Sequence, residues 1–432
     1  MAVQFDVPPG GSKLAVTVTT VAPPGITSAA ARLLVDDAVV TSKTQALLGI
    51  EAIRQVIYSR AYDGGVNILN LKQSNTAKYR AGLAATAAGT RDTIVVAEGP
   101  STTCGQSTGA GTAQARQAWP MVLATILNNS GVPASADTMF GDHNCWGLAK
   151  TAANYLTGDD RVTLAGGATP GAIPTVGGAI WDITLAGRSV TFAPPRPVTK
   201  FDVWYRDFAA GRDFSTAIDG GATTTTVVAG TGFPRKATIS AGALGLHSIT
   251  VAQATGTPTL IGIVGYDDTA GRKETKIYNW GMSGAQTADM INNGPDASGG
   301  RVAMLSAVTP DLYIGDDMVI NDWRQSIDPA TTAANLQTKV DQVRAAGADF
   351  IFTTPLFDSG VSDAQVAPYV QAILDVATRN DLAVIDVRGA MRSYAAAQAA
   401  GWESDSVHLT QAGYVWKAGI VRDALRQIAA LG

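Results

Sequence analysis

The sequence has few of the residues that usually build metal and redox centres, and it contains no long apolar run. Its 432 residues include two cysteines and three histidines, which are too few for a metal cluster built on cysteine. We find no stretch of about 18 uninterrupted apolar residues, so no transmembrane helix is expected. The N-terminus does not begin with a basic segment followed by an apolar one, so the sequence predicts no secretory signal peptide.

Charge is also sparse in this chain. Charged residues make up 16% of it, the formal net charge is −4, and no block is rich in Lys and Arg. Nucleic acid and anionic membrane surfaces are therefore not expected partners, whereas a neutral or acidic sugar is compatible with this balance. Hydrophobic residues make up 46%, which is enough for a large core. A chain of this length is expected to form two or three domains.

The first two segments of the chain differ in their apolar spacing. Residues 1–90 begin with an extended pattern, continue with helical spacing from residue 28 to about 61, and end in a short helix at 78–88. We interpret this segment as an attachment or oligomerisation module, or as an extension packed on the main domain. Residues 91–145 open with an apolar strand, a turn of small residues and a helix at 113–128, which is a common start of an α/β domain.

The remaining chain divides at residue 268. Residues 146–268 contain short β-like runs between turns rich in Gly, Asp and Pro, a pattern typical of an all-β sandwich of the jelly-roll kind. Residues 269–432 alternate strands with helices, which predicts a parallel sheet covered by helices on both faces. The expected strands there are 277–279, 311–320, 349–354 and 382–386, and the expected helices are 333–346, 364–380 and 410–431. We therefore expect an α/β domain in two sequence pieces, 91–145 and 269–432, with a β-sandwich inserted between them.

A hydrolase that uses a Ser/His pair must take its base from the three histidines of this chain. His247 lies in a β-run of the inserted segment, and His143 lies at the edge of that segment. His408 has the best neighbourhood, because Asp405 is three residues upstream and can turn back onto the imidazole Nδ1–H. The alternative is that Asp405 or Thr410 only caps the following helix and that His408 is a surface residue.

Four short motifs, each on an expected strand end or loop, occur in the order found in the SGNH (GDSL-like) hydrolase family. Gly99-Pro-Ser101 resembles the Gly-Asp-Ser block, and Asn279-Trp-Gly-Met-Ser-Gly284 resembles the second block. Val319-Ile-Asn321-Asp322 resembles the Gly-x-Asn-Asp block, and Asp405-Ser-Val-His408 resembles the final Asp-x-x-His block. The resemblance covers about residues 91–145 and 270–432, and it implies a flavodoxin-like, three-layer α/β fold.

The resemblance also implies a role for each matching residue. Ser101 would attack an ester carbonyl, His408 would take and return its proton, and Asp405 would orient His408. The oxyanion would be held by the backbone N–H groups of Ser101 and Gly284 and by the side-chain amide of Asn321. Such a reaction needs no metal or organic cofactor.

The sequence departs from the family pattern at two positions. Pro100, which has no N–H and a fixed φ, stands where the family has Asp. Val319 stands where the family has Gly, and Asp316 and Asp317 lie unusually within the preceding strand region. These departures favour an alternative in which the domain is a non-catalytic relative.

The function that we expect is removal of O-acetyl groups from a polysaccharide or glycan. The inserted segment carries aromatic side chains that either stack on sugar rings or form the sandwich core, namely Trp181, Phe192, Phe201, Trp204, Tyr205, Phe208 and Phe214. An N-terminal module before an esterase domain is also similar to phage tail deacetylases. This resemblance implies a virion-associated chain that can form homo-oligomers, and the alternative is a chain that becomes extracellular by another route. The alternatives are a glycan-binding or phage tail structural protein with a vestigial SGNH domain, and a lipase or thioesterase. Cys104 and Cys145 either form one disulfide or remain free thiols.

Overall fold

The computed structural model describes the chain in two compact units, Met1–Asp63 and Gly64–Gly432. In the first unit it describes the backbone of strands β1 (Ala2–Asp6), β2 (Ala15–Thr19) and β3 (Ala31–Leu34). In the second unit it describes residues 68–106, 114–140, 159–166, 169–171, 175–178, 180–184, 187–291 and 300–431. No helix in these described residues is both long and apolar enough to cross a membrane.

The three strands of the first unit form an antiparallel sheet in the order β1-β2-β3. Strand β3 pairs with β2, with Ala31 opposite Val18 and Leu34 opposite Ala15. The helix predicted from residue 28 is therefore wrong over 31–34, because pairing with a neighbouring strand overrides local spacing. The rest of that predicted helix lies outside the described residues.

The centre of the second unit is a mostly parallel sheet in the order β4-β21-β20-β19-β5-β18-β6. Neighbouring strands run parallel except for β4, which is antiparallel to β21. The central strands are apolar and buried on both faces, as a parallel sheet covered by helices requires. Their bounds are β4 (Ile68–Leu69), β5 (Thr93–Glu98), β6 (Ala134–Ser135), β18 (Thr275–Asn279), β19 (Leu312–Gly315), β20 (Asp349–Thr353) and β21 (Ala383–Ile385).

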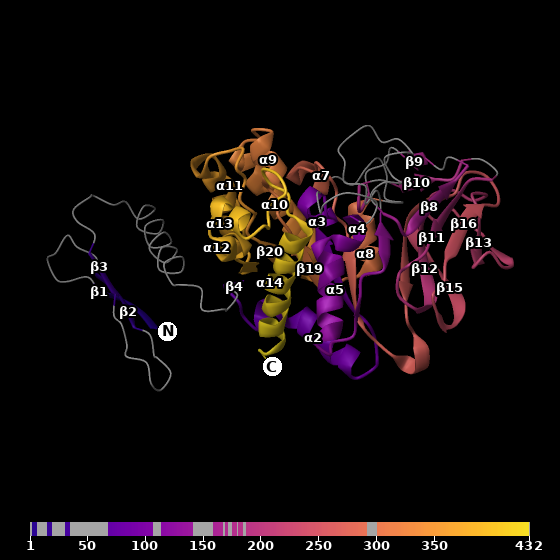
Figure 1. Cartoon of the computed structure of the whole chain (residues 1–432), viewed down its shortest axis with the longest axis horizontal. Helices are drawn as coiled ribbons and strands as arrows, with labels where there is room; N and C mark the ends of the chain where they lie inside the picture. The colour runs from indigo at the N-terminus through magenta and orange to yellow at the C-terminus, as the bar shows by residue number, and fades with distance from the viewer. Residues whose placement is uncertain are drawn as a thin grey trace. The chain divides into compact units, whose positions relative to one another are not determined.

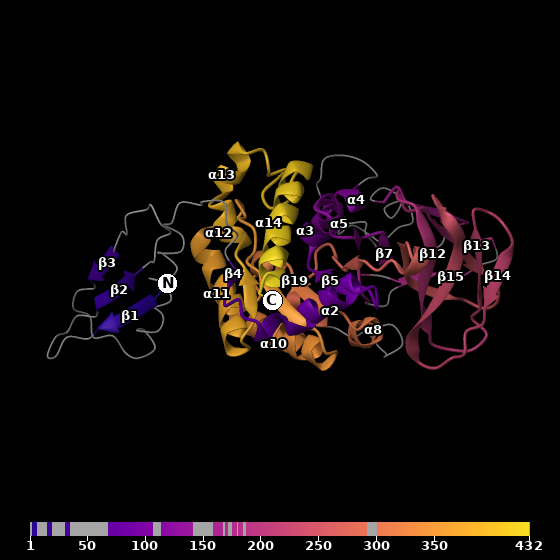
Figure 2. The ribbon, with the colours of Figure 1, turned by 90° about the horizontal axis from the view of Figure 1, so that it is seen from below.

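Helices cover both faces of this sheet (Figures 1 and 2). Helices α5 (Trp119–Asn129) and α14 (Gln411–Ala429) pack together on one face, and α10 (Pro329–Ala345) and α11 (Asp363–Arg379) pack together on the other. Local signals begin these helices, including a capping box at Ser362 for α11 and the Thr410 side chain, which accepts from the Gly413 N–H, for α14. The shorter helices are η1 (Ser74–Thr76), α2 (Ala77–Ala87), α3 (Ser101–Cys104), α4 (Gln114–Gln117), η2 (Thr269–Gly271), α7 (Thr287–Ile291), α8 (Arg301–Val308), α9 (Ile320–Arg324), α12 (Val387–Met391) and α13 (Tyr394–Ala399).

Two antiparallel sheets lie between the two sequence pieces of the α/β region. One has the order β15-β12-β17-β10-β9, with β7 also paired to β17, and the other has the order β14-β13-β16-β11-β8. Inward-facing residues of both sheets, such as Phe192, Phe201 and Ile263, form one hydrophobic core. The strands are β7 (Thr138–Phe140), β8 (Val162–Ala165), β9 (Thr169–Gly171), β10 (Ile180–Asp182), β11 (Ser189–Phe192), β12 (Val198–Asp207), β13 (Phe214–Ile218), β14 (Thr223–Thr226), β15 (Phe233–Gly245), β16 (Ile249–Gln253) and β17 (Thr259–Tyr266).

The antiparallel sheets are fastened to the α/β region at the strands that lead into and out of them. The ring of Phe140 in β7 packs 5.3 Å from the ring of Tyr278 in β18, measured between centroids. Arg196 reaches back to the start of β7, where its Nε donates to Asp137 at 2.6 Å.

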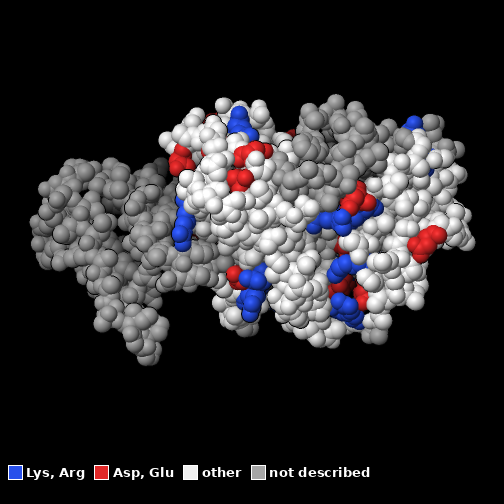
Figure 3. Space-filling view, in the orientation of Figure 1, with Lys and Arg blue, Asp and Glu red and all other residues white. Residues whose placement is uncertain are grey.

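On the face drawn in Figure 3, basic and acidic side chains lie next to one another rather than in a patch of one sign.

Three expected boundaries differ from the structure. Strand β4 pairs with β21 and α2 contacts β5, so residues 68–87 belong to the α/β region and not to an N-terminal module ending at residue 90. Strand β7 already joins the antiparallel sheet, upstream of the expected start at 146. The strand expected over 311–320 ends at Gly315, and α9 begins at Ile320. Long-range pairing decides each of these boundaries, and local patterns do not record it.

Six of the seven aromatic residues expected either to stack on sugars or to form a core are buried in the antiparallel sheets. Trp181, Phe192, Phe201, Trp204, Tyr205 and Phe214 are each at most 8% exposed. Phe208 is 43% exposed, and the guanidinium groups of Arg206 and Arg212 lie 4.1 and 5.3 Å from its ring centroid. Core packing therefore accounts for all of this set except Phe208.

Candidate active site

Ser101 begins a short helix directly after a central strand of the parallel sheet. Strand β5 ends at Glu98, Gly99 and Pro100 make the turn, and α3 starts at Ser101. A Cβ at Gly99 would lie 2.1 Å from the backbone oxygen of Asp316, so only glycine fits there. Pro100 is extended, with φ −81° and ψ −152°, and precedes the first helical residue. The departure from the family pattern at Pro100 is thus accommodated as the residue that caps α3.

His408 and Asp405 lie in one closed loop before the last helix. A β-bridge between Glu403 and Leu409 joins the ends of this loop. Within it, Asp405 Oδ1 accepts hydrogen bonds from the backbone N–H groups of Val407 and His408, both at 2.8 Å. The loop therefore has a defined shape before any contact with Ser101 is considered.

The structure brings these two segments together. His408 Nε2 lies 2.9 Å from Ser101 Oγ, and His408 Nδ1 lies 2.7 Å from Asp405 Oδ2. Ser101 and His408 are buried, while the Asp405 side chain is 45% exposed. Burial would raise the pKa of Asp405, but hydrogen bonds from the backbone amides of His408 and Val407 and from the imidazole hold it below its ordinary value. A carboxylate that stays ionised can orient an imidazole and stabilise its protonated form.

The other two expected donors lie beside each other. Gly284 is exposed at a left-handed turn, with φ +71°, just before Ala285. Asn321, on α9, donates from Nδ2 to the Ala285 oxygen at 2.9 Å. Its neighbour Asp322 accepts from the Thr287 N–H at 2.9 Å, which joins α9 to α7.

The turn that carries Gly284 is also tied to the turn that carries Ser101. The Met282 N–H donates to the Gly99 oxygen at 2.9 Å. Asn279 donates from Nδ2 to the Thr103 oxygen at 3.2 Å. The Ser101, Gly284 and Asn321 segments therefore adjoin one another at the carboxyl ends of β5, β18 and β19, which is where ligands bind in open α/β sheets.

The other two histidines are outside this arrangement. His247 belongs to the antiparallel sheets, where its Nδ1 lies 2.6 Å from Asp219 Oδ2 and its Nε2 lies 2.8 Å from the Ala243 oxygen. His143 lies outside the described residues, as does Cys145. Cys104, in α3, is disulfide-bonded, so the free-thiol alternative does not apply to it. Within the described ranges, no group of three His, Cys, Asp or Glu side chains could hold a metal ion.

Charged side chains around the Asp405 loop were missed by sequence reasoning. Arg324 on α9 donates from Nε to Asp358 Oδ2 at 2.6 Å and from Nη2 to the Ser406 hydroxyl at 2.7 Å. Glu403 has both carboxyl oxygens buried without a hydrogen-bond partner among the described residues. Burial, together with the negative charges of Asp405, Asp317 and Asp358, raises its pKa to about 8. Glu403 is therefore a neutral acid at neutral pH, next to an ionised one.

A second buried cluster was also missed, at the end of β5. Glu98 accepts from Arg301 Nε at 3.0 Å and pairs with Lys339 Nζ at 2.5 Å. All three side chains are at most 1% exposed. Arg301 donates in addition to the Asp289 oxygen, so the cluster links β5 to α7. The sequence signal for this cluster was a charged residue on the apolar face of a helix, Arg301 on α8 and Lys339 on α10.

A protein-family model matches the part of the chain that carries all of these site residues except Ser101. Residues 250–416 match the model of the GDSL-like Lipase/Acylhydrolase family. The chain carries a GDSL-like domain. The family match and the fold it shares with a solved esterase support an esterase. The match covers Gly284, Asn321, Asp405 and His408, and it begins downstream of Ser101, within β16 of the antiparallel sheets.

Several solved structures are similar to this chain at low sequence identity, and the first of them shares its fold. A peptidoglycan O-acetylesterase matches with a TM-score of 0.61 and 16% identity, over 84% of this chain and 99% of that one. A family two carbohydrate esterase from Cellvibrio japonicus matches with a TM-score of 0.30 and 13% identity, over 68% and 98%. A family 2 carbohydrate esterase with a carbohydrate binding domain from Corynascus thermopiles matches with a TM-score of 0.27 and 16% identity, over 62% and 99%. No curated protein matches the sequence.

Proposed function

We propose that this chain removes O-acetyl groups from a glycan, with peptidoglycan as the first substrate to test. The observation that carries the proposal is the continuous chain of contacts from Ser101 Oγ to His408 Nε2 at 2.9 Å and from His408 Nδ1 to Asp405 at 2.7 Å. A hydroxyl, an imidazole and a carboxylate in this order are the parts of a nucleophilic acyl transfer.

The first half of the reaction forms an acetyl-enzyme. Ser101 Oγ attacks the acetyl carbonyl while His408 Nε2 takes the hydroxyl proton, and Asp405 stabilises the resulting imidazolium. The backbone N–H groups of Ser101 and Gly284 and the Asn321 side chain donate to the developing oxyanion. His408 then gives its proton to the sugar oxygen as the bond between that oxygen and the acetyl carbonyl carbon breaks. The sugar leaves with a free hydroxyl, and the acetyl group remains on Ser101.

The second half releases acetate. His408 takes a proton from water, the water oxygen attacks the acetyl carbonyl, and the same donors hold the second oxyanion. The proton returns to Ser101 Oγ as the acyl bond breaks. Asn321 can serve in both steps, because its amide has two N–H groups and Ala285 takes one of them.

Two observations support a carbohydrate ester over a lipid ester. The domain shares its fold with a peptidoglycan O-acetylesterase at a TM-score of 0.61. The sequence also has no long apolar segment of the kind that covers a lipase site. We further infer that the two antiparallel sheets form a jelly-roll-like sandwich beside the site, and that the separate unit Met1–Asp63 serves for attachment or oligomerisation.

The test is hydrolysis of p-nitrophenyl acetate and acetate release from O-acetylated peptidoglycan by the purified chain. Ser101→Ala is expected to lower kcat by about 10⁶-fold, and to end labelling by a fluorophosphonate probe. Ser306→Ala, an exposed serine on α8, is the matched control and keeps full activity. Equal turnover by Ser101→Ala and wild type would overturn the proposal. A strong preference for octanoate over acetate esters would instead favour a lipase.

A further inference from the structure

Three fully buried charges lie beneath the turn that carries Ser101. Asp316 and Asp317 follow the end of β19, and Lys417 lies on α14; all three side chains are 0% exposed. Lys417 Nζ lies 2.8 Å from Asp316 Oδ1 and 2.5 Å from Asp317 Oδ2. Burying charges is costly unless they are paired and hydrogen-bonded, so the position of this cluster calls for a physical reason.

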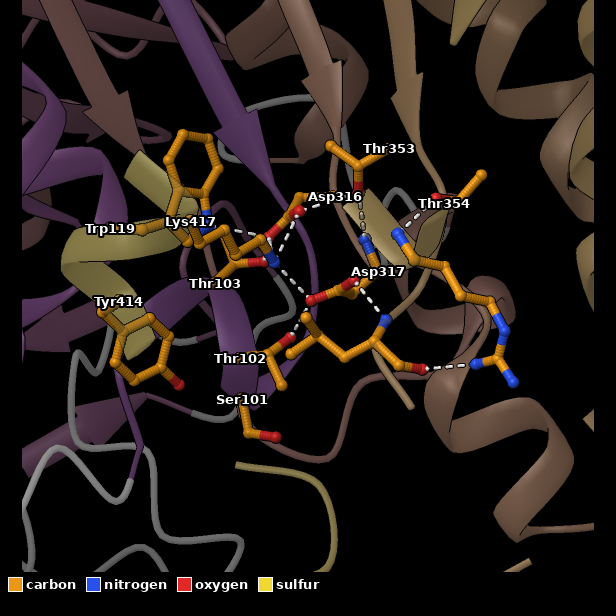
Figure 4. Close-up of polar contacts among 12 residues, drawn as sticks. Ser101, Thr102, Thr103, Trp119, Asp316, Asp317, Thr353, Thr354, Tyr414 and Lys417 are labelled. Carbon is orange, nitrogen blue, oxygen red and sulfur yellow. Dashed lines mark hydrogen bonds and ion pairs between the residues drawn. The ribbon is translucent and has the colours of Figure 1, made fainter. Parts of the chain in front are cut away.

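Both carboxylates hold α3 through the two residues after Ser101 (Figure 4). The Thr102 hydroxyl donates to Asp317 Oδ2 at 2.7 Å, and the Thr103 hydroxyl donates to Asp316 Oδ2 at 2.8 Å. Helix α3 has four residues, too few to be stable by its own hydrogen bonds. The orientation of the turn is therefore set by what lies beneath it.

The same cluster is joined to the helix that follows His408. Lys417 is on α14, which begins after its cap Thr410, two residues beyond His408. Burial would lower the pKa of Lys417, but Asp316 and Asp317 raise it above its ordinary value, so the ammonium stays charged. One ammonium group therefore connects the Ser101 turn to the element that anchors the His408 loop.

The rest of the scaffold fixes the carboxylates in place. Asp316 also accepts from Trp119 Nε1 at 2.7 Å and from the Thr353 hydroxyl at 2.8 Å. Asp317 Oδ1 accepts from the Leu356 N–H at 3.2 Å. Asp317 has a φ of +49°, a left-handed conformation that is uncommon for a residue other than glycine. The surrounding hydrogen bonds hold Asp317 in this uncommon conformation.

We propose that Asp316, Asp317 and Lys417 are positioning residues that, through the Thr102 and Thr103 hydroxyls, hold Ser101 Oγ in line with His408. This inference rests on the proposed function, since positioning has meaning only if Ser101 reacts. It assigns a task to the two aspartates that depart from the family pattern. The three residues act through α3 and do not touch substrate.

The test removes the two hydroxyls and keeps the shape of the side chains. In the double variant Thr102→Val/Thr103→Val, kcat for p-nitrophenyl acetate is expected to fall about 10- to 100-fold with KM unchanged, because small misplacements of a reacting group are that costly. The rate of fluorophosphonate labelling falls in parallel. Thr102→Ser/Thr103→Ser keeps both hydroxyls and restores kcat to within about threefold of wild type, on the same geometric reasoning.

Thr354→Val is the matched control. Thr354 is also a buried threonine whose hydroxyl donates to an aspartate, Asp386, at 2.9 Å, but it does not contact α3. It is expected to lower Tm as the double variant does while keeping kcat. Suppose that wild type turns over ester. The positioning role alone is then overturned if the double variant has the kcat of wild type, or if Thr354→Val loses as much kcat as the double variant. If wild type neither turns over ester nor reacts with the probe, the proposed function fails and the positioning role fails with it.

Discussion

Glu403 and Asp405 lie two residues apart in one loop, and the pKa of Glu403 is raised while that of Asp405 is lowered. Asp405 accepts two backbone N–H groups and the His408 imidazole, which hold its pKa below the ordinary value against the effect of burial. Glu403 has no such donor among the described residues, and burial beside Asp405, Asp317 and Asp358 raises its pKa to about 8. The two pKa values therefore differ because hydrogen bonds stabilise the charged form of Asp405 and not that of Glu403.

The raised pKa of Glu403 predicts an unusual pH dependence of stability. From about pH 4.5 to about pH 8 the folded chain keeps a proton that the unfolded chain releases, so this group's contribution to stability is lost as pH rises. Glu403→Gln stays neutral at every pH. We expect the Tm of wild type to fall relative to that of Glu403→Gln between pH 5 and pH 9, measured by circular dichroism. A Tm difference that does not change with pH would contradict the assignment.

Substitutions of the base and of its orienting carboxylate should differ in severity. His408→Gln removes the proton acceptor, and we expect kcat to fall about 10⁶-fold, whereas Asp405→Asn keeps the imidazole and should lower kcat about 10⁴-fold. Steady-state kinetics with p-nitrophenyl acetate measures both. His247→Gln, in the antiparallel sheets, is the control and should retain wild-type kinetics. Loss of activity in His247→Gln equal to that in His408→Gln would show that the base has been misassigned.

The side-chain amide of Asn321 is expected to act in the transition state and not in substrate binding. Asn321→Ala should lower kcat about 10²- to 10³-fold and leave KM nearly unchanged, as removal of one oxyanion donor does. Asn335→Ala also removes a side-chain amide, one that donates to the Thr287 hydroxyl at 3.0 Å, and should leave kcat intact. If Asn321→Ala changes KM alone, the amide binds substrate instead.

The close approach of Gly281 to α3 predicts a steric effect on both stability and activity. A Cβ at residue 281 would lie 2.5 Å from the Cys104 nitrogen, a backbone atom that cannot move without shifting the Ser101 turn. Gly281→Ala should cost about 1–3 kcal/mol of stability, and it should lower kcat. Gly419→Ala, in α14 with open space around it, should be neutral or stabilising by up to about 1 kcal/mol. Thermal unfolding measures the Tm of both variants. If Gly281→Ala and Gly419→Ala have equal Tm values, the predicted clash at residue 281 is wrong.

Local structure could be predicted from sequence where a short range of residues determines it. The strand expected at 349–354 and the helices expected at 333–346, 364–380 and 410–431 are confirmed as elements, and the structure places them at 349–353, 329–345, 363–379 and 411–429. Continuous apolar runs and capping residues predict them because both act within a few positions. The contact between Asp405 and His408 could also be predicted locally, because two residues three positions apart can meet within one closed loop. Lys417 could have been suspected as a charge on the buried face of α14, but its partners are about a hundred positions away.

The sequence by itself determined the order of the motifs, the alternation of strands and helices, and the residue types available for chemistry. Only the tertiary structure decided that Ser101 and His408, 307 positions apart, come within 2.9 Å, and that most aromatic residues of the insertion are core. The physical reason is that parallel strands end at one edge of a sheet whatever lies between them in the chain. Which strands become neighbours depends on long-range pairing and packing, which no local pattern contains.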